Sequence, residues 1–155
     1  NENYYLKPMN CPFHHTIFSM RPRSYRELPL RLAEYGLCHR YEDSGALMGL
    51  MRVRAMEMND AHIYCAEEDA VEEFLGVLKL HEYYYNALGI EKYHMVLALR
   101  NPANTKYHGD EAMWNRAESM TRKAMEISGI AYEVEEDGAA FYGPKLDFQI
   151  TSSIG

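Results

Sequence analysis

The stretch MRVRAMEMNDAHIYC, from Met51 to Cys65, mixes arginines, methionines, an aspartate and a histidine and contains no glycine or proline. With a period of two, one face carries Arg52, Arg54, Met56, Met58, Asp60, His62 and Tyr64, and the other carries Met51, Val53, Ala55, Glu57, Asn59, Ala61, Ile63 and Cys65. Such alternation predicts a β-strand. The first face has cations at one end, thioethers in the middle, and an acid beside an imidazole at the other end.

The preceding run, LPLRLAEYGLCHRYE (28–42), is ambiguous when taken alone. The spacing of Leu28, Leu30 and Leu32 is typical of a strand, whereas LRLAEYG would also suit a short helix that ends at Gly36. The turn-rich segment EDSGALMG (42–49) that follows favours the strand. Two extended runs joined by such a loop predict an antiparallel pair.

The rest of the chain predicts helices between two groups of strands. We expect a short strand at 4–8 and then a helix with Asn10 as a candidate N-cap and Pro12 in its first turn. A helix at 67–88, ended by Gly89, and a strand at 93–99 follow, and then a helix with Asp110 as a candidate N-cap and Gly129 at its end. Strands at 131–135 and 145–151 flank a glycine-rich turn. This order predicts an α+β fold, an antiparallel sheet packed by helices.

The composition excludes several classes of protein. A chain of 155 residues with 47% hydrophobic and 25% charged residues is typical of one folded domain. No apolar run approaches the ~20 residues of a membrane span, and no signal peptide is recognisable. The three cysteines form no CxxC motif, which favours a reducing compartment. The net charge of −7 is a poor footprint for nucleic-acid binding through this segment alone.

Arginines at the ends of the predicted pair are candidate phosphate ligands. Arg40 leaves the first strand, and Arg52 and Arg54 enter the second. Guanidinium groups bind phosphate oxygens in a bidentate manner, and cations are costly to bury without an anion. The competing interpretation is a surface ladder of ion pairs with Glu42, Asp43 and Glu57.

Cys11 and His62 are candidate zinc ligands, since catalytic zinc sites combine about three protein ligands with an open position. Spacing alone does not select them, because His14, His15 and His39 have the same donor chemistry and Cys11 also suits a buried structural position. In FYGPKLDF (141–148), the tight bend at Gly143 and Pro144 allows Tyr142 and Lys145 to face one cavity, or to lie on an ordinary half-buried strand.

Three motifs together resemble the threonyl-tRNA synthetase family of class II aminoacyl-tRNA synthetases. They are KPMNCP (7–12), the run from Ser24 to Cys65, and GAAFYGPKLDF (138–148), and they occur in the family's order along almost the whole chain. The resemblance implies an α+β fold with a class II antiparallel sheet flanked by helices, here incomplete. It also implies that residues of about 28–65 form motif 2, which holds ATP.

The resemblance assigns roles to residues of this sequence. Arg40 matches the arginine that contacts the α-phosphate of ATP, and Lys145 matches a cation near the carboxylate and phosphate. Glu42 matches a contact to the adenine amine, Arg52 a contact to the outer phosphates, and Met56 a contact to the adenine ring. Met9, Asp60 and Tyr142 match threonine-binding residues, and Cys11 and His62 match zinc ligands. It further implies ATP with Mg²⁺, L-threonine and tRNA(Thr) as partners, a homodimer, and a cytoplasmic location.

Zinc has a physical reason to be present in such a family. Threonine and valine are nearly isosteric, and an apolar pocket separates isosteres poorly. A metal with open positions binds both the amino group and the hydroxyl of threonine, whereas valine lacks the second ligand. Serine carries the hydroxyl and passes this filter, so the family uses a separate editing domain.

The resemblance also implies parts that residues 1–155 do not contain. These are motif 1, motif 3, a histidine that completes the zinc site beyond residue 155, and the editing and anticodon-binding domains. We therefore expect a single partial catalytic domain that is inactive by itself. Met56 and Met58 stand where the family commonly has phenylalanine and glutamine, and Met58 cannot replace an amide's hydrogen bonds. Two other hypotheses are a non-catalytic synthetase-like binding domain and a class II synthetase for serine or proline.

Overall fold

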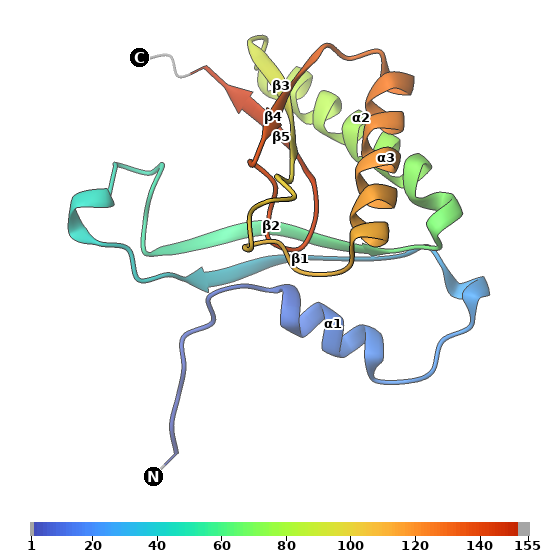
Figure 1. Ribbon diagram of the computed structural model, residues 1–155. Coiled ribbons are helices and arrows are strands. Elements are labelled where there is room, and N and C mark those ends of the chain that lie inside the picture. Colours follow the sequence, from blue (N-terminus) through green and yellow to red (C-terminus); the bar gives the residue numbers. More distant parts are fainter. Residues whose placement is uncertain (1, 152–155) are drawn as a thin grey trace. The chain divides into compact units, whose positions relative to one another are not determined.

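The computed structural model describes residues 2–151 and divides the chain into two compact units. We call them the N-terminal unit (Asn1–Ala66) and the C-terminal unit (Glu67–Gly155). The expected mixture of strands and helices is confirmed (Figure 1). Whether the chain is a single partial catalytic domain stays a prediction.

The N-terminal unit is built on the predicted antiparallel pair, β1 (Leu30–His39) and β2 (Ala55–Tyr64). The short helix α1 (Cys11–Ser19) lies alongside this pair in Figure 1, and two 3-10 turns, η1 (Tyr25–Glu27) and η2 (Ser44–Ala46), occupy the connections. The register places Glu34 opposite Asp60 and Gly36 opposite Met58. The strand interpretation of the ambiguous run is therefore confirmed, and its helical alternative is wrong.

The burial of β2 alternates with the predicted period of two. Met56, Met58, Asp60 and His62 are half-buried, while the residues between them from Ala55 to Ala61 are exposed. On β1 the matching face contains the buried Gly36 and Cys38. The covered face therefore includes the thioethers, the acid and the imidazole.

Two local expectations near the N-terminus are wrong. Residues 4–8 form no strand, although the His39 N–H donates to the Lys7 carbonyl at 2.7 Å and so joins this segment to the end of β1. Asn10 does stand before the first residue of α1, but its side chain caps nothing. The Asn10 side chain instead bonds to residues distant in the chain, as described below.

The C-terminal unit contains a three-stranded sheet and two long helices. In chain order they are η3 (Glu67–Asp69), α2 (Ala70–Leu88), β3 (Tyr93–Leu99), α3 (Glu111–Ser128), β4 (Tyr132–Glu136) and β5 (Lys145–Ile150). The strand order is β4-β3-β5. β3 pairs antiparallel with β5 but parallel with β4, so this sheet is mixed and not purely antiparallel. The parallel pair follows from α3, which returns the chain to the same end of β3.

Apolar side chains form the core of this unit. β3 is buried from Met95 to Leu99, as expected for a central strand that reads as a continuous hydrophobic run. Leu78 of α2 and Met125 of α3 pack against Met95, and the rings of Tyr93, Tyr132 and Phe148 surround them. α2 and α3 thus cover the sheet face that carries Met95.

The ends of the two long helices follow local rules. The Asp110 carboxylate accepts a hydrogen bond from Met113 N–H at 2.7 Å, the N-cap contact that the sequence predicts. Gly89 and Gly129 end α2 and α3 with φ values of 69° and 68°, a left-handed conformation that favours glycine. These boundaries are therefore encoded locally.

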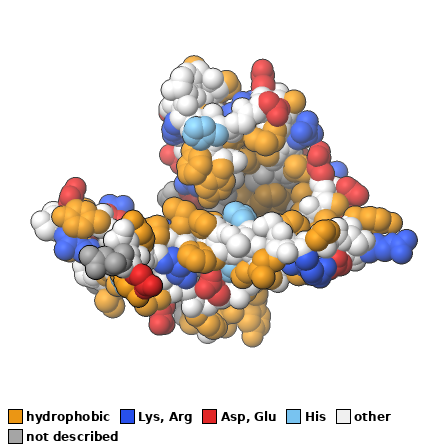
Figure 2. Space-filling view, turned by 90° about the horizontal axis from the view of Figure 1, so that it is seen from below, with side chains coloured by type: hydrophobic (Ala, Val, Ile, Leu, Met, Phe, Trp, Pro, Cys, Tyr) orange, Lys and Arg blue, Asp and Glu red, His pale blue; other side chains and the backbone are white. Residues whose placement is uncertain are grey.

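Large hydrophobic side chains are also exposed on both units. Tyr41 and Leu50 of the N-terminal unit are 89% and 96% exposed, and Leu88 of the C-terminal unit 70%. In the space-filling view such side chains alternate with acidic and basic ones (Figure 2). Among the described residues, no helix has both the length and the apolar character needed to cross a membrane.

Candidate functional site

Asp60 is held in place by a buried amide. Asn10, only 1% exposed, donates from Nδ2 to the Asp60 carboxylate at 3.0 Å and accepts from Cys38 Sγ at 3.5 Å. Gly36 makes room for this amide, because a β-carbon at that position would lie 2.3 Å from Asn10 Nδ2. A neutral amide thereby orients the carboxylate on the covered face of β2.

His62 lies at the end of a second polar chain on the same face. Its Nδ1 is 2.7 Å from His14 Nδ1, and His14 Nε2 is 3.0 Å from the Glu34 carboxylate. Glu34 also lies 3.7 Å from Lys7 Nζ. His14 is 4% exposed, so this chain extends into the interior of the unit. The acids Glu34 and Asp60 face each other across the strands, and each has its own partner.

The donors at this end have the chemistry of a zinc site. Burial lowers the pKa of His62, and the neighbouring Asp60 carboxylate acts in the opposite direction. Burial, and to a smaller extent Cys11, raises the pKa of Tyr64, so Cys11 of α1 lies near the strand that carries His62. A thiolate and an imidazole suit zinc. The described residues contain no group of three or more histidine, cysteine, aspartate or glutamate side chains placed to hold a metal ion.

The arginines at the other end of the pair have partners of their own. Arg40 Nε donates to the Pro8 carbonyl at 3.2 Å, and Arg54 Nε donates to the Glu42 carbonyl at 2.9 Å. Arg52 lies 3.9 Å from the Glu42 carboxylate, with the Arg52 side chain 60% exposed. The competing interpretation, a surface ion pair, therefore holds for Arg52 and Glu42. An exposed pair at this distance contributes little free energy, so Arg52 and Glu42 can exchange it for other partners.

Tyr142 and Lys145 belong to the C-terminal unit. Tyr142 is 70% exposed, and its ring meets Phe141 edge-on at 4.9 Å. Lys145 pairs with Asp147, two residues further along β5. Of the predicted site residues, the N-terminal unit contains Met9, Cys11, Arg40, Glu42, Arg52, Met56, Asp60 and His62; these two are contributed by the other unit.

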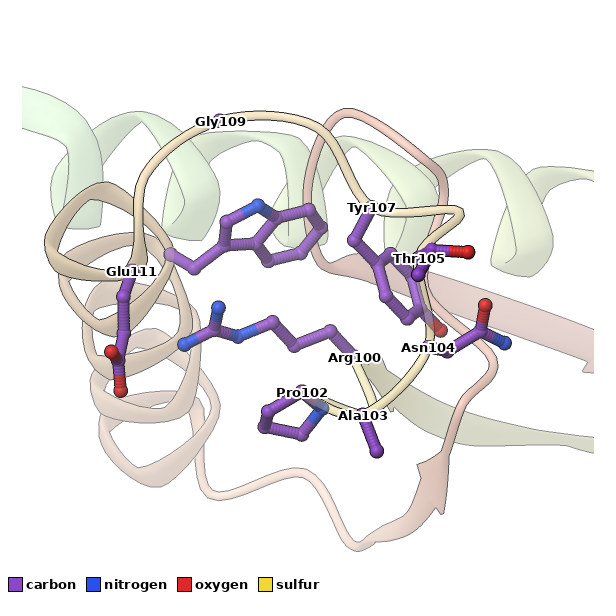
Figure 3. A pocket seen from close by; sticks show the side chains of 9 residues that line it. Arg100, Pro102, Ala103, Asn104, Thr105, Tyr107, Gly109 and Glu111 are labelled. Carbon is purple, nitrogen blue, oxygen red and sulfur yellow. The ribbon is translucent and has the colours of Figure 1, made fainter.

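A separate pocket of about 370 Å³ in the C-terminal unit is lined by the loop that follows β3 and by the first turn of α3. Figure 3 shows Arg100 extended across it, with Pro102 beside it. The Arg100 guanidinium also lies over the Trp114 ring, 5.5 Å from its centroid. The guanidinium donates to Asn115 Oδ1 at 2.7 Å and lies 3.8 Å from Glu118, while its Nε is buried without a hydrogen bond. The arginine thus closes one wall of the pocket.

Asp137 organises the loop beside this pocket. Its carboxylate accepts hydrogen bonds from Tyr107 at 2.6 Å and Asn104 at 3.1 Å, and Lys106 Nζ lies 3.2 Å away. The hydrogen bond from Tyr107, followed by that from Asn104, lowers the pKa of Asp137. Asp137 has a φ of 66°, a conformation that aspartate tolerates in turns.

Sequence reasoning missed the partners of the predicted residues. Asn10 was expected only as a helix cap and His14 only as an alternative ligand, yet both hold groups on β2. Their signal in the sequence is faint: polar residues three or four positions apart on one side of a short helix. Nothing local indicates partners that lie 48 and 50 residues away.

Comparison with known proteins places this geometry in a family. The family described as "tRNA synthetase class II core domain (G, H, P, S and T)" matches residues 1–155. The chain belongs to the class II tRNA synthetase core-domain family. The expected class of fold is thereby confirmed.

Within this family the chain is similar to threonine-specific members. It is 51% identical over 154 residues to a threonine–tRNA ligase of Thermus thermophilus, covering 99% of this chain and 23% of that protein. It is 48% identical over 156 residues to threonine–tRNA ligase 1 of Bacillus subtilis, with coverages of 100% and 24%. The chain therefore spans about a quarter of the length of these relatives.

Solved structures agree with this similarity. The RNA binding domain of threonyl-tRNA synthetase from Cryptosporidium parvum superposes with a TM-score of 0.84 at 38% identity, covering 96% of this chain and 36% of that one. A putative threonyl-tRNA synthetase from Aeropyrum pernix gives 0.77 at 33% identity, with coverages of 92% and 34%. The resemblance noted from the motifs is confirmed.

Proposed function

We propose that this chain is part of the catalytic core of a threonine–tRNA ligase. The observation that carries the proposal is its similarity, at about half of all positions and over its whole length, to relatives of that name. The covered face of β1 and β2 supports it, because it combines an oriented acid, an imidazole and a nearby thiol.

The reaction that we propose is activation of threonine followed by transfer to tRNA(Thr). The threonine carboxylate attacks the α-phosphorus of ATP, the bond to the bridging oxygen breaks, and pyrophosphate leaves. Such chemistry depends on positioning and charge neutralisation more than on a general base. Arg40 and Lys145 neutralise the charge at the α-phosphate, and Arg52 binds the outer phosphates together with Mg²⁺.

The remaining residues hold the substrates in this proposal. Glu42 releases Arg52 to read the adenine amine, and Met56 offers the adenine ring a polarisable surface. Asp60, pre-oriented by Asn10, binds the substrate ammonium with Tyr142, beside Met9. Cys11 and His62 are the residues that hold zinc, with a further histidine; when bound, the metal supplies open positions for the amino and hydroxyl groups of threonine. A homodimer and a cytoplasmic location follow from the same resemblance.

Amino-acid-dependent ATP–pyrophosphate exchange tests this function in the intact protein that contains the chain. We expect exchange with threonine, slower exchange with serine, and almost none with valine or proline. Cys11→Ala should abolish the threonine signal, whereas Cys65→Ala, the matched control, should retain it. A preference for serine or proline would contradict the threonine assignment. Absence of both exchange and ATP binding in calorimetry would favour a non-catalytic binding domain.

A further inference from the structure

Four side chains from separate segments form a continuous chain that ends at His62. Lys7 precedes α1, Glu34 is on β1, His14 is on α1 and His62 is on β2. The successive distances are 3.7 Å, 3.0 Å and 2.7 Å. The two rings meet edge-on, with 4.8 Å between centroids and an interplanar angle of 88°. Every link lies within the N-terminal unit.

The direction of the protons along this chain follows from the chemistry of its ends. The Glu34 carboxylate, next to the Lys7 ammonium, only accepts hydrogen bonds. His14 must therefore place a proton on Nε2, the atom 3.0 Å from Glu34. With one proton on each ring, His14 Nδ1 is an acceptor, so the proton in the 2.7 Å contact is on His62 Nδ1.

The consequence for His62 concerns its other nitrogen. When Nδ1 carries the proton, Nε2 has a free lone pair and is able to bind a metal. A free imidazole in water prefers the opposite arrangement, with the proton on Nε2. The contact with His14 reverses that preference and also fixes the plane of the ring.

We propose that His14 is a positioning residue, which, anchored by Glu34 and Lys7, holds His62 in the Nδ1–H tautomer that offers Nε2 to zinc. This inference rests on the proposed zinc role of His62 and goes beyond it, because it assigns an outer partner to the ligand. Outer hydrogen-bond partners of ligating histidines orient the ring and raise its basicity, and their loss typically weakens metal binding about 10- to 100-fold.

His15 provides a matched control beside His14. Its ring also meets His62 edge-on, with 5.2 Å between centroids, but its Nδ1 contacts the Tyr64 hydroxyl at 2.7 Å. Removing either imidazole takes a ring away from His62. Only the removal of His14 takes away the acceptor for the His62 proton.

The tautomer of His62 in the zinc-free intact protein is the direct test. Protonated and unprotonated ring nitrogens have well-separated NMR chemical shifts in isotope-labelled histidine, read here at about pH 8, above the ordinary histidine pKa. We expect an Nδ1–H tautomer in the wild type and after His15→Leu. His14→Leu should shift His62 towards Nε2–H. His14→Asn should restore Nδ1–H, because Asn Oδ1 replaces the acceptor and keeps the site polar.

Zinc affinity, measured by competition with a chelator, is the second readout. We expect His14→Leu to weaken binding about 10- to 100-fold, with His14→Asn closer to wild type and His15→Leu unchanged. An Nε2–H tautomer in the wild type, or equal zinc affinity in all variants, would overturn the positioning role. If the wild type shows the Nδ1–H tautomer but binds no zinc, the proposed metal site fails while the tautomer assignment stands.

Discussion

The interiors of the two units differ in kind. Among the described residues of the N-terminal unit, those buried most deeply are Asn10, His14, Gly36 and Cys38, which are polar or small. In the C-terminal unit the corresponding residues are mainly apolar, among them Leu78, the β3 run and Met125. One unit encloses a hydrogen-bonded network, and the other encloses a hydrophobic core.

This difference indicates that the two interiors serve different purposes, orientation of side chains in one unit and stability in the other. Apolar cores stabilise a fold without regard to direction, because the free energy scales with the area removed from water. A buried polar network contributes less net stability but fixes orientation, and each unsatisfied group in it is costly. The N-terminal unit therefore holds Asp60 and His62 at defined angles, while the C-terminal unit gains stability from its packing.

The largest effect that we expect is on the apolar core. Met95→Ala should reduce the free energy of unfolding by about 2–5 kcal/mol, because it removes a side chain that is 1% exposed and leaves a cavity. Amide hydrogen exchange of β3 in the intact protein measures the change. Met20→Ala, at a position 77% exposed, is the control. A similar loss in both variants would contradict the placement of the core.

The second prediction addresses the polar network. Gly36→Ala places a β-carbon against Asn10 and should cost about 1–3 kcal/mol of stability in the β1–β2 pair. Because the displaced amide releases Asp60, the KM for threonine should rise more than kcat falls. Exchange of β1 amides and pyrophosphate-exchange kinetics are the two measurements. A loss of stability with an unchanged KM for threonine would show that Asn10 does not contribute to substrate binding.

Gly76→Ala is the counterpart in the C-terminal unit and should have the opposite sign. Gly76 is an exposed residue within α2, and no atom lies within 4 Å of its added β-carbon. The variant should gain about 0.5–1 kcal/mol, because alanine loses less backbone entropy in a helix. Amide exchange of α2 reports the change. Destabilisation would mean that α2 packs more closely at this position than the structure shows.

The smallest effect concerns the Asp137 loop and depends on pH. Since hydrogen bonds lower the pKa of Asp137 from its ordinary 3.8, its stabilising contribution is present above that pH and is lost as pH falls through the folded-state pKa. The Asp137→Asn variant should therefore have a slightly lower melting temperature than the wild type near neutral pH. The melting temperatures of the two proteins should become equal under more acidic conditions. A difference that persists at low pH would point to the amide's geometry instead.

The sequence predicted the elements of both units well, for a common reason. Strand alternation and the caps Asp110, Gly89 and Gly129 act over a few residues, so their pattern survives in any one segment. The sharing of one face of β2 by Met56, Met58, Asp60 and His62 followed from period two alone. The parallel pairing of β4 and the strand expected at 4–8 were misjudged, because pairing depends on segments distant in the chain.

The sequence by itself determined which residues share one face of β2 and, through its motifs, the family. Only the tertiary structure decided what orients them: Asn10 for Asp60, and His14 with Glu34 for His62. The physical reason is that side-chain direction is a local property of the backbone. A hydrogen-bond partner about 50 residues away is selected only when the chain brings both groups into a shared interior.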